Sequence, residues 1–453
     1  MNTKAIQKAI DACTADGGGR VLVPPGKYVT GSLMLKSNVE LHLMQGACLY
    51  GSVYASDYPH MITCMKSFKP NGTDRQEFFG LIMAEGAEKI AVTGKGTIDG
   101  RGAFSDDFRS YPTSDDGSTW HKPQRPKIIM FYDCKHVKVH DIHTINPNNW
   151  AQHYKRCDFV NIRGVTIHAH ANANGDGIDL DECRDVTVSD CFLDTDDNAI
   201  ILKSLGTRDC ENITITNSIF ASKITAIKTG TESGGGFKNI AISNCIIRSS
   251  YEEVHFDKHR QQMNGSGIAL EITDGGTMDG VTISNIVMED CYAPFFIRLG
   301  NRGRKYGGFE PEPGKMRNII LDNIICKNVR NDFTSTIAGF PGHYVENITM
   351  SNIRMECEGG IGLDNINPMP ENEKDHPWPG MYGRNQQYPA YGIFFRHVKN
   401  LRIFNMQIEY AEKDLRPALY LNRVHNAKIF YSDFQAVNEP VFVINSSDIS
   451  MVK

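Results

Sequence analysis

The chain has 453 residues, of which 40% are hydrophobic and 22% charged, so it can bury a large core and lacks the composition of a disordered protein. Its formal net charge of -5 argues against general electrostatic binding to nucleic acid or to an anionic membrane surface. No apolar run reaches the roughly 18–20 residues that span a bilayer.

The first residues predict a helix. Apolar side chains between Lys4 and Ala15 recur at helical spacing, and no signal peptide precedes them. The sequence contains 12 cysteines but no CxxC pair and no cluster at zinc-like spacing. Several of these cysteines lie inside apolar strand patterns, which favours buried free thiols over a disulfide framework.

A short strand pattern recurs from residue 137 onward. Each copy has alternating apolar residues, a small polar residue and a second apolar stretch, as in VKVHDIHT at Val137. Val137 and Val160 are 23 residues apart, whereas Ile348 and Leu401 are 53 residues apart, which indicates insertions in some copies. The copies begin at Val137, Val160, Val186, Ile213, Ile240, Val281, Ile319, Ile348 and Leu401, with a weaker one at Ala427.

Two columns of asparagine run in register with this repeat. Asparagine tolerates the left-handed backbone conformation that a bend requires, and stacked asparagine side chains can hydrogen-bond from rung to rung. The fifth position of the repeat is Asn217, Asn244, Asn285, Asn323, Asn352 and Asn405, or Asp141 and Asp190. The position before the repeat is Asn212, Asn239, Asn318, Asn347, Asn400 and Asn426.

A repeat of this length that is built only of strands predicts a coil of a parallel β-helix. Periods of about 20–50 residues indicate a solenoid, and neighbouring coils would lie about 4.8 Å apart. A propeller would need a blade motif, and a sandwich would not hold asparagine in a fixed column. We therefore predict an all-β, single-stranded parallel β-helix over residues 1–453, one domain, with the N-terminal helix covering the first coil.

Acidic residues concentrate on two neighbouring coils. The segment Asn174-Gly175-Asp176 is followed by Asp196-Asp197, with 20 residues between Asp176 and the first of that pair. This spacing stacks the two segments on adjacent rungs, where converging carboxylates repel and at least one pKa should rise. Carboxylates with separated pKa values are what an acid/base pair requires. The alternative is that Asp176, Asp179 and Asp194 are turn caps that bind nothing or bind a cation.

These segments resemble glycoside hydrolase family 28, the polygalacturonase and rhamnogalacturonan hydrolase family of right-handed parallel β-helices. The resemblance covers most of the chain and includes Gly17–Tyr28 and Gly94–Gly100. Asn174-Gly175-Asp176 is similar to the family's Asn-Thr-Asp motif, with Gly in place of Thr. Asp196-Asp197, followed by Ile201–Ser204, is similar to its paired-aspartate motif.

The resemblance implies hydrolysis of O-glycosidic bonds by single displacement with inversion, without a cofactor or a metal. Asp196 would be the general acid that protonates the leaving oxygen. Asp197 and Asp176 would hold and deprotonate the attacking water. An inverting acid and base stand roughly 6.5–9.5 Å apart, which residues on adjacent rungs can provide.

Two departures from the family pattern affect the substrate. The Gly-His-Gly motif is absent from the stretch 224–232, and the Arg-Ile-Lys uronate clamp is absent from 267–272. Either Lys228, or Arg298 with Arg302 or Arg304, could replace the clamp, and two glutamates could bind sugar hydroxyls. The alternative is an exposed rung with ordinary charges. The candidate substrate-binding residues are Lys228, Glu232, Glu271, Arg298, Asn149 and Lys203.

These departures favour a rhamnogalacturonan-type or exo-acting enzyme over a standard endo-polygalacturonase. Long insertions at 58–79, 104–126 and 368–387 could close one end of a groove. We expect an acidic plant cell-wall polysaccharide or oligosaccharide as partner, no nucleic acid or membrane partner, and a monomer. The family also implies a secreted or periplasmic location with a trimmed signal peptide. A polysaccharide lyase and a non-catalytic glycan-binding β-helix remain the alternatives.

Overall fold

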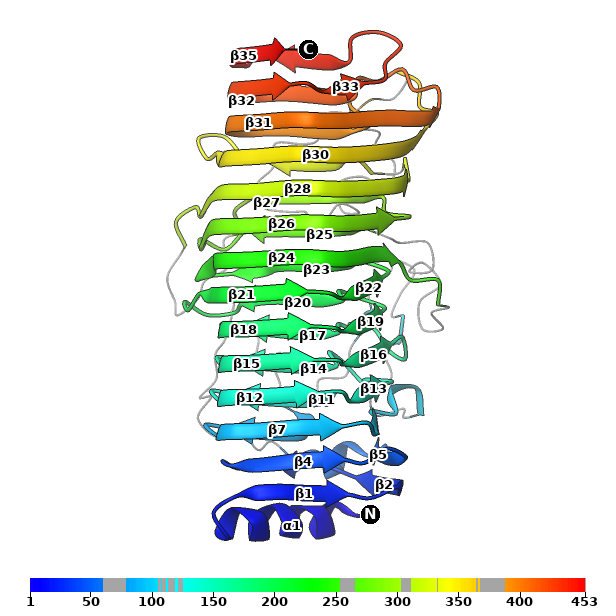
Figure 1. Ribbon diagram of the computed structural model, residues 1–453, viewed down its shortest axis with the longest axis vertical. Helices are drawn as coiled ribbons and strands as arrows, with labels where there is room; N and C mark the ends of the chain where they lie inside the picture. Colours follow the sequence, from blue (N-terminus) through cyan, green and yellow to red (C-terminus); the bar gives the residue numbers. More distant parts are fainter. Residues whose placement is uncertain are drawn as a thin grey trace. The chain divides into compact units, whose positions relative to one another are not determined.

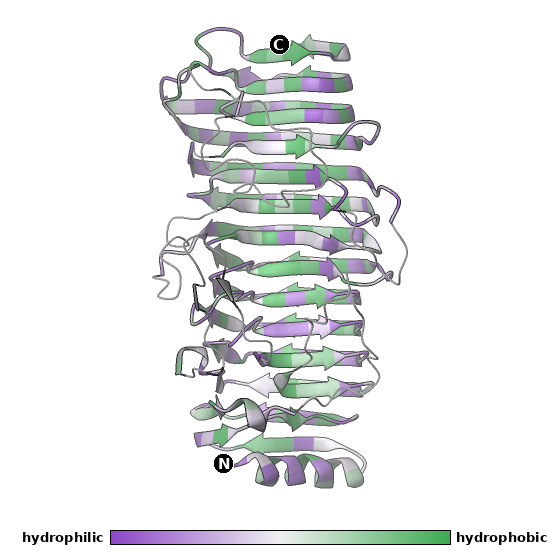
Figure 2. Cartoon of the chain, turned by 180° about the vertical axis from the view of Figure 1, so that it is seen from behind, coloured by the Kyte–Doolittle hydropathy of each residue, from purple (hydrophilic) through white to green (hydrophobic). Residues whose placement is uncertain are grey.

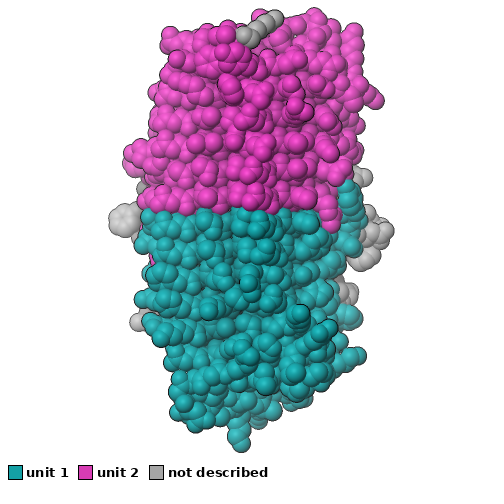
Figure 3. All heavy atoms as spheres, viewed as in Figure 1, with its two compact units in different colours: residues 1–202, 210–223, 250–262 teal, residues 203–209, 224–249, 263–453 magenta. Residues whose placement is uncertain are grey.

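The computed structural model of the protein describes most of the chain, and the described part divides into two compact units (Figure 3). Unit 1 comprises residues 1–202, 210–223 and 250–262, and unit 2 comprises residues 203–209, 224–249 and 263–453. Each unit is a set of parallel coils. That residues 1–453 form a single domain stays a prediction. The described residues are 1–59, 79–104, 107, 111–112, 119–120, 125–252, 265–302, 311–331, 333–363, 366 and 388–452.

Helix α1 (Thr3–Ala15) covers the first coil of unit 1, as predicted (Figure 1). Its residue Ile10 is completely buried. The amide of Gln7 makes two hydrogen bonds to the backbone of Met34, accepting from its N–H at 2.8 Å and donating to its carbonyl at 3.0 Å. The amide therefore satisfies two backbone groups of the first coil, which has no preceding coil to pair with.

Unit 1 has three parallel sheets, each with one short strand from every coil (Figure 1). Sheet 1 contains β1 (Gly19–Val23), β4 (Val39–Leu43), β7 (Glu88–Gly94), β12 (Lys135–His140), β15 (Asp158–Arg163), β18 (Arg184–Ser189) and β21 (Cys210–Thr216). Sheet 2 contains β2 (Gly26–Thr30), β5 (Ala47–Gly51), β8 (Thr97–Asp99), β13 (His143–Ile145), β16 (Thr166–Ala169), β19 (Phe192–Thr195) and β22 (Ile219–Ser222). Sheet 3 contains β3 (Leu33–Met34), β6 (Gly80–Glu85), β11 (Lys127–Tyr132), β14 (Gln152–Lys155), β17 (Ile178–Asp181) and β20 (Ile200–Ser204), whose last two residues belong to unit 2.

The sheets of unit 1 differ in what their outer faces carry. Along the strands of sheet 1, buried and exposed side chains alternate: Val137 and Val139 are buried, and Lys138 between them is exposed. Figure 2 shows the same mixture of hydrophobic and hydrophilic residues along the strands. In sheet 3 every residue of β14 and β17 is buried, including charged residues such as Lys155 and Asp181. Buried charges need partners, so polar contacts concentrate on sheet 3.

Unit 2 has longer strands, because single strands extend through bends that separate two strands in unit 1 (Figure 1). One sheet contains β23 (Thr225–Ser233), β25 (Ser266–Ile272), β27 (Ala293–Leu299), β29 (Ser335–Ala338), the first residues of the long strands β31 (Ile393–Glu412) and β32 (Leu419–Phe430), and β34 (Val441–Ile444). The other strands are β24 (Gly236–Ser249), β26 (Thr277–Glu289), β28 (Lys315–Val329), β30 (Val345–Gly359), β33 (Asp433–Phe434) and β35 (Ser447–Val452).

The predicted asparagine columns are confirmed. All of the predicted positions, the aspartates included, have positive φ, between 48° at Asn405 and 61° at Asp141. Within unit 2 the amides form ladders: Asn323 donates to Asn285 at 2.7 Å, and Asn426 donates to Asn400 at 2.7 Å. Each ladder joins bends of successive coils, so the columns fix the register of the repeat.

The remaining described elements of unit 1 lie in two connections from sheet 2 to sheet 3, between β5 and β6 and between β8 and β11. They are the 3-10 helices η1 (Ala55–Asp57) and η3 (Gly102–Phe104) and the antiparallel pair β9 (Tyr111–Pro112) and β10 (Thr119–Trp120). Most of the predicted insertions, at 58–79, 104–126 and 368–387, lie outside the described residues. The cysteines of the described residues are thiols outside any disulfide, and Cys191, Cys245 and Cys326, which lie in the apolar strand patterns, are buried as predicted. Across the described ranges, no helix is both long and apolar enough to cross a membrane.

Candidate active site

The predicted catalytic aspartates lie in the turns of unit 1 that lead into sheet 3. Asp176 precedes β17, and Asp196 and Asp197 precede β20. The N–H of Gly177 donates to the Asn198 carbonyl at 2.9 Å, so the two turns stack on neighbouring coils, as their spacing predicts. A Cβ at Gly177 would lie 2.3 Å from the Ala199 carbonyl oxygen, so this close stacking requires glycine.

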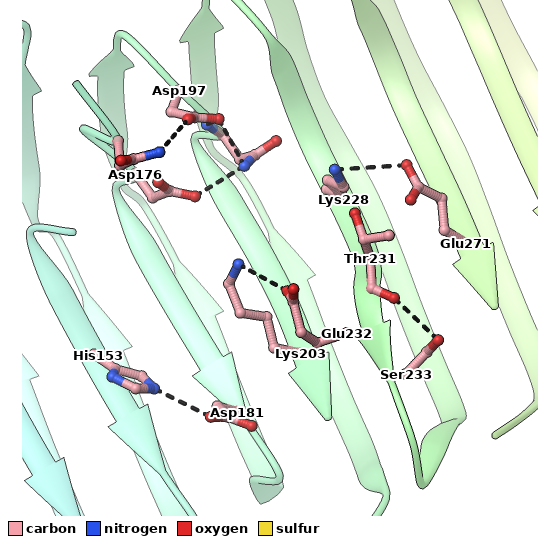
Figure 4. Close-up of polar contacts among 12 residues, drawn as sticks. His153, Asp176, Asp181, Asp197, Lys203, Lys228, Thr231, Glu232, Ser233 and Glu271 are labelled. Atoms are coloured by element: carbon pink, nitrogen blue, oxygen red, sulfur yellow. Dashed lines mark hydrogen bonds and ion pairs between the residues drawn. The ribbon is translucent and has the colours of Figure 1, made fainter. Parts of the chain in front are cut away.

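A single amide joins two of the three carboxylates. The Asn198 Nδ2 donates to Asp176 Oδ2 at 2.8 Å and to Asp197 Oδ1 at 2.9 Å (Figure 4). The backbone N–H of Asn198 also donates to Asp197 Oδ1 at 3.0 Å. Asn198 is not among the predicted site residues, although it follows the aspartate pair directly. Neutral donors orient both carboxylates without adding a positive charge.

A second asparagine approaches the same carboxylate. Asn174 Nδ2 donates to Asp197 Oδ2 at 3.4 Å, and Asn174 has the left-handed φ of 58°. The buried guanidinium of Arg125 donates to Asn174 Oδ1 at 2.9 Å and to the Asn148 carbonyl at 3.2 Å. Because Oδ1 accepts from arginine, the Nδ2 group must face the aspartate. Arg125 therefore orients Asn174, and no motif in the sequence indicated it.

Asp196 has a different environment from the other two aspartates. It is completely buried, whereas Asp176 is 2% exposed and Asp197 is partly exposed. The carbonyl of Asp197 accepts from Thr195 Oγ1 and from Ser222 Oγ, each at 2.7 Å, which fixes the turn around Asp196. The structure thus brings Asp176 and Asp197 onto one amide, and Asp196 is the most buried of the three aspartates.

The interpretation of Asp179 and Asp194 as turn caps is wrong, because both lie inside strands. Asp179 is buried in β17, directly across from His153 of β14. Asp194 in β19 accepts from His170 Nε2 at 2.8 Å. The length of the coils sets the strand register, and this register places Asp179 and Asp194 inside strands.

A buried ionic cluster on sheet 3 surrounds His153. Its Nε2 lies 3.3 Å from Asp181 Oδ2, and Lys155 Nζ donates to the same oxygen at 2.8 Å. Burial lowers the pKa of His153 to about 4, against the opposing effect of Asp181. Burial acts to raise the pKa of Asp181, but Lys155 and His153 hold it below its usual range. The imidazole is therefore neutral at pH 7.

The predicted substrate-binding charges of unit 2 are partnered with one another. Lys203 Nζ lies 3.5 Å from Glu232, and Lys228 Nζ lies 3.5 Å from Glu271 (Figure 4). Arg302 lies 3.7 Å from Glu232 and also makes a bidentate contact with Asp274. The alternative of ordinary exposed charges does not hold for Lys228 and Glu271, which are both buried.

Two of these residues are too buried to be simple surface ligands. Glu271 is completely buried, and burial raises its pKa against the opposing charges of Lys228 and Arg302. Arg298, across from Glu271 in the strand register, is 2% exposed and donates to the Gly339 carbonyl at 3.0 Å. Asn149 lies in unit 1, partly exposed, in the turn before β14. Arg304 lies outside the described residues.

The comparisons with known proteins agree with the resemblance seen in the sequence. An exo-poly-alpha-D-galacturonosidase of Dickeya chrysanthemi is 28% identical over 294 residues, which cover 54% of this chain and 48% of the relative. An endo-polygalacturonase of Pectobacterium parmentieri is 24% identical over 377 residues, which cover 81% of this chain and 87% of the relative. The chain thus spans about half the length of the first relative and most of the second.

Among solved structures, an exopolygalacturonase from Thermotoga maritima superposes with a TM-score of 0.62 at 22% identity. The match covers 78% of this chain and 83% of that chain, and it confirms the parallel β-helix fold. The model of the family described as glycosyl hydrolases family 28 matches residues 13–372, which include all the aspartates discussed above. The chain belongs to glycosyl hydrolases family 28.

Proposed function

We propose that this protein is an inverting glycoside hydrolase that cleaves O-glycosidic bonds in pectic polysaccharides or oligosaccharides. The observation that carries the proposal is the amide of Asn198, which holds Asp176 and Asp197 together on adjacent coils of a family 28 chain. Two carboxylates fixed in this way can share one water molecule. A general base for hydrolysis needs such a water within hydrogen-bond reach.

The roles of the aspartates follow from this arrangement and from the family pattern. A water held by Asp197 and Asp176 attacks the anomeric carbon and gives its proton to one of these carboxylates. The bond from that carbon to the leaving oxygen breaks, and Asp196 donates its proton to that oxygen. One water is consumed, and the configuration at the anomeric carbon inverts.

The charged residues of unit 2 are proposed to bind the acidic sugar. Lys228 and Lys203 supply positive charge, and Glu232, whose side chain is 18% exposed, can accept from hydroxyl groups. Glu271 is completely buried, so we assign it to orienting Lys228, and Arg298 to shaping the same strands. Because each lysine has a carboxylate partner, a uronate would meet partly neutralised cations. Asn149 is proposed to bind the sugar from unit 1.

We further propose exo action, since the Dickeya relative is named an exo-acting galacturonosidase. The substrate is proposed to be an acidic plant cell-wall polysaccharide of the galacturonide or rhamnogalacturonan type, which the protein meets outside the cell as a monomer.

The test is digestion of a pectin panel by the purified chain and by Asp196→Asn. Polygalacturonan, rhamnogalacturonan I and rhamnogalacturonan II are incubated with each protein, and the products are resolved by mass. We expect single sugars or dimers from the original chain and none from the variant. Unsaturated products would indicate a lyase. Binding without turnover by the original chain would indicate a glycan-binding protein.

A further inference from the structure

A buried lysine lies on the coil next to Asp196. The N–H of Lys223 donates to the Thr195 carbonyl at 3.2 Å, and the N–H of Ser250 donates to the Ser222 carbonyl at 3.0 Å. In a parallel sheet, the N–H of a residue donates to the carbonyl of the residue that precedes its partner on the neighbouring strand. Asp196, Lys223 and Ser250 therefore occupy equivalent positions on three successive coils of unit 1.

Lys223 is held in a network of buried polar groups. The lysine side chain is almost completely buried, at 5% exposure, and its Nζ donates to the Ser250 carbonyl at 3.4 Å. The Ser250 hydroxyl donates to Asp194 Oδ1 at 2.5 Å, and His170 lies 2.8 Å from the same oxygen. Asp194 and Ser250 thus fix the place of the lysine beside Asp196.

The charges that face Lys223 come from several elements. Burial lowers the pKa of the Lys223 amine, while Asp196, Asp194 and Glu252 favour its charged form. The positive charge in turn acts on His170, whose own pKa is lowered mainly by burial. An ammonium group on the coil next to a buried carboxyl stabilises the ionised form of that carboxyl.

We propose that Lys223 is a positioning residue that keeps a positive charge beside Asp196 and so sets the pH at which Asp196 gives up its proton. The proposal rests on the function proposed above, in which Asp196 is the general acid. In such an enzyme the alkaline limb of the pH–rate profile reports the loss of the acid's proton. Lys223 holds that limb at a lower pH than a neutral side chain would.

The test compares pH profiles of kcat/KM for Lys223→Met, Lys223→Arg and the original chain on polygalacturonan. We expect the alkaline limb of Lys223→Met to move up by about one pH unit, since a nearby opposite charge shifts a carboxyl by that order. Lys223→Arg keeps the charge and should restore the original limb. Lys138→Met, which changes an exposed lysine of sheet 1, is the matched control and should leave the limb in place.

An unmoved limb in folded Lys223→Met would overturn the proposal. Folding is checked by circular dichroism and thermal unfolding, and Lys223→Gln provides a second neutral variant. If neither neutral variant folds, the lysine is structural and the proposal is overturned as well. The two proposals can fail separately. If Asp196→Asn is active, Asp196 is not the general acid. If Asp196→Asn is inactive but the alkaline limb of Lys223→Met does not move, only the proposed role of Lys223 is refuted.

Discussion

The turns of unit 1 and the strands of unit 2 hold their candidate-site carboxylates in different ways. In the turns of unit 1, Asp176 and Asp197 accept hydrogen bonds from neutral asparagine amides. On the strands of unit 2, Glu271 and Glu232 lie beside lysines at 3.5 Å. An amide orients a carboxylate and leaves its charge available, whereas a lysine neutralises it. The comparison distinguishes Asp176 and Asp197, which are proposed to hold the water, from Glu271 and Glu232, which are proposed to belong to the binding surface.

The largest expected effect is from Asp197→Asn in unit 1. We expect kcat to fall by about 10²–10⁴-fold, the usual contribution of a general base, with the melting temperature little changed. Steady-state kinetics on polygalacturonan measure the loss. Asp141→Asn, which changes an aspartate of the predicted bend column with φ of 61°, is the control and should keep full activity. Full activity in Asp197→Asn would contradict the proposal that Asp197 in unit 1 holds and deprotonates the attacking water.

A smaller effect is expected from Asn198→Ala. Without the shared amide, Asp176 and Asp197 lose their common donor and the water is less well placed. Because one hydrogen bond to a charged group is worth about 1.5–3 kcal/mol, we expect kcat to fall by roughly 10–100-fold. Asn161→Ala removes a half-buried amide of sheet 1, which donates to Thr187 of the same sheet, and serves as control. Equal activities of the two variants would contradict the role of the bridge.

In unit 2, Glu271→Gln is expected to alter stability more than chemistry. The pKa of Glu271 is raised above the ordinary value of 4.5, so its contribution to stability is complete below pH 4.5 and is lost as pH rises through the raised value. Urea unfolding from pH 4 to 8 should show this decline in the original chain and a flatter profile in the variant. We expect kcat to stay within about tenfold, since one neutral hydrogen bond replaces an ion pair. If the variant and the original chain show the same dependence of stability on pH, burial does not raise the pKa of Glu271.

The smallest effect on activity is expected from Asn323→Ala in an asparagine ladder of unit 2. Alanine loses the 2.7 Å bond to Asn285 and adopts a positive φ of 53° with difficulty. We expect a loss of about 1–2 kcal/mol in the free energy of unfolding and unchanged kcat. Asn323→Gly, which tolerates the same φ, should recover part of the loss. If the alanine and glycine variants are equally stable, the positive φ is not the reason why asparagine stabilises this position.

The sequence predicted the fold because its period is regular. The apolar alternation after Val137 and the asparagines at fixed positions, such as Asn244 and Asn285, determine coils and bends without any knowledge of long-range contacts. The same period placed Asp176 next to Asp197. These features depend only on local spacing, which the printed sequence displays directly.

The rest of the site depends on details that spacing does not reveal. The stretch that replaces the Gly-His-Gly motif begins at Ile224, one residue after Lys223, so its spacing does not predict a lysine beside Asp196. Arg125 lies at the end of the 104–126 insertion, whose length is irregular, and reaches Asn174 from 49 residues away. The pairing of Lys228 with Glu271 likewise crosses a coil that is longer than its neighbours. Insertions therefore hide contacts that the regular coils make predictable.

The most direct test of the account is the configuration of the first product formed by the purified chain. Proton NMR of a polygalacturonan digest, recorded before mutarotation is complete, distinguishes the two anomers. The account predicts that the new reducing end first appears with the configuration opposite to that of the cleaved bond, because a water held by Asp197 and Asp176 attacks in one displacement. A first product that retains the original configuration, or that carries an unsaturated ring, would contradict it.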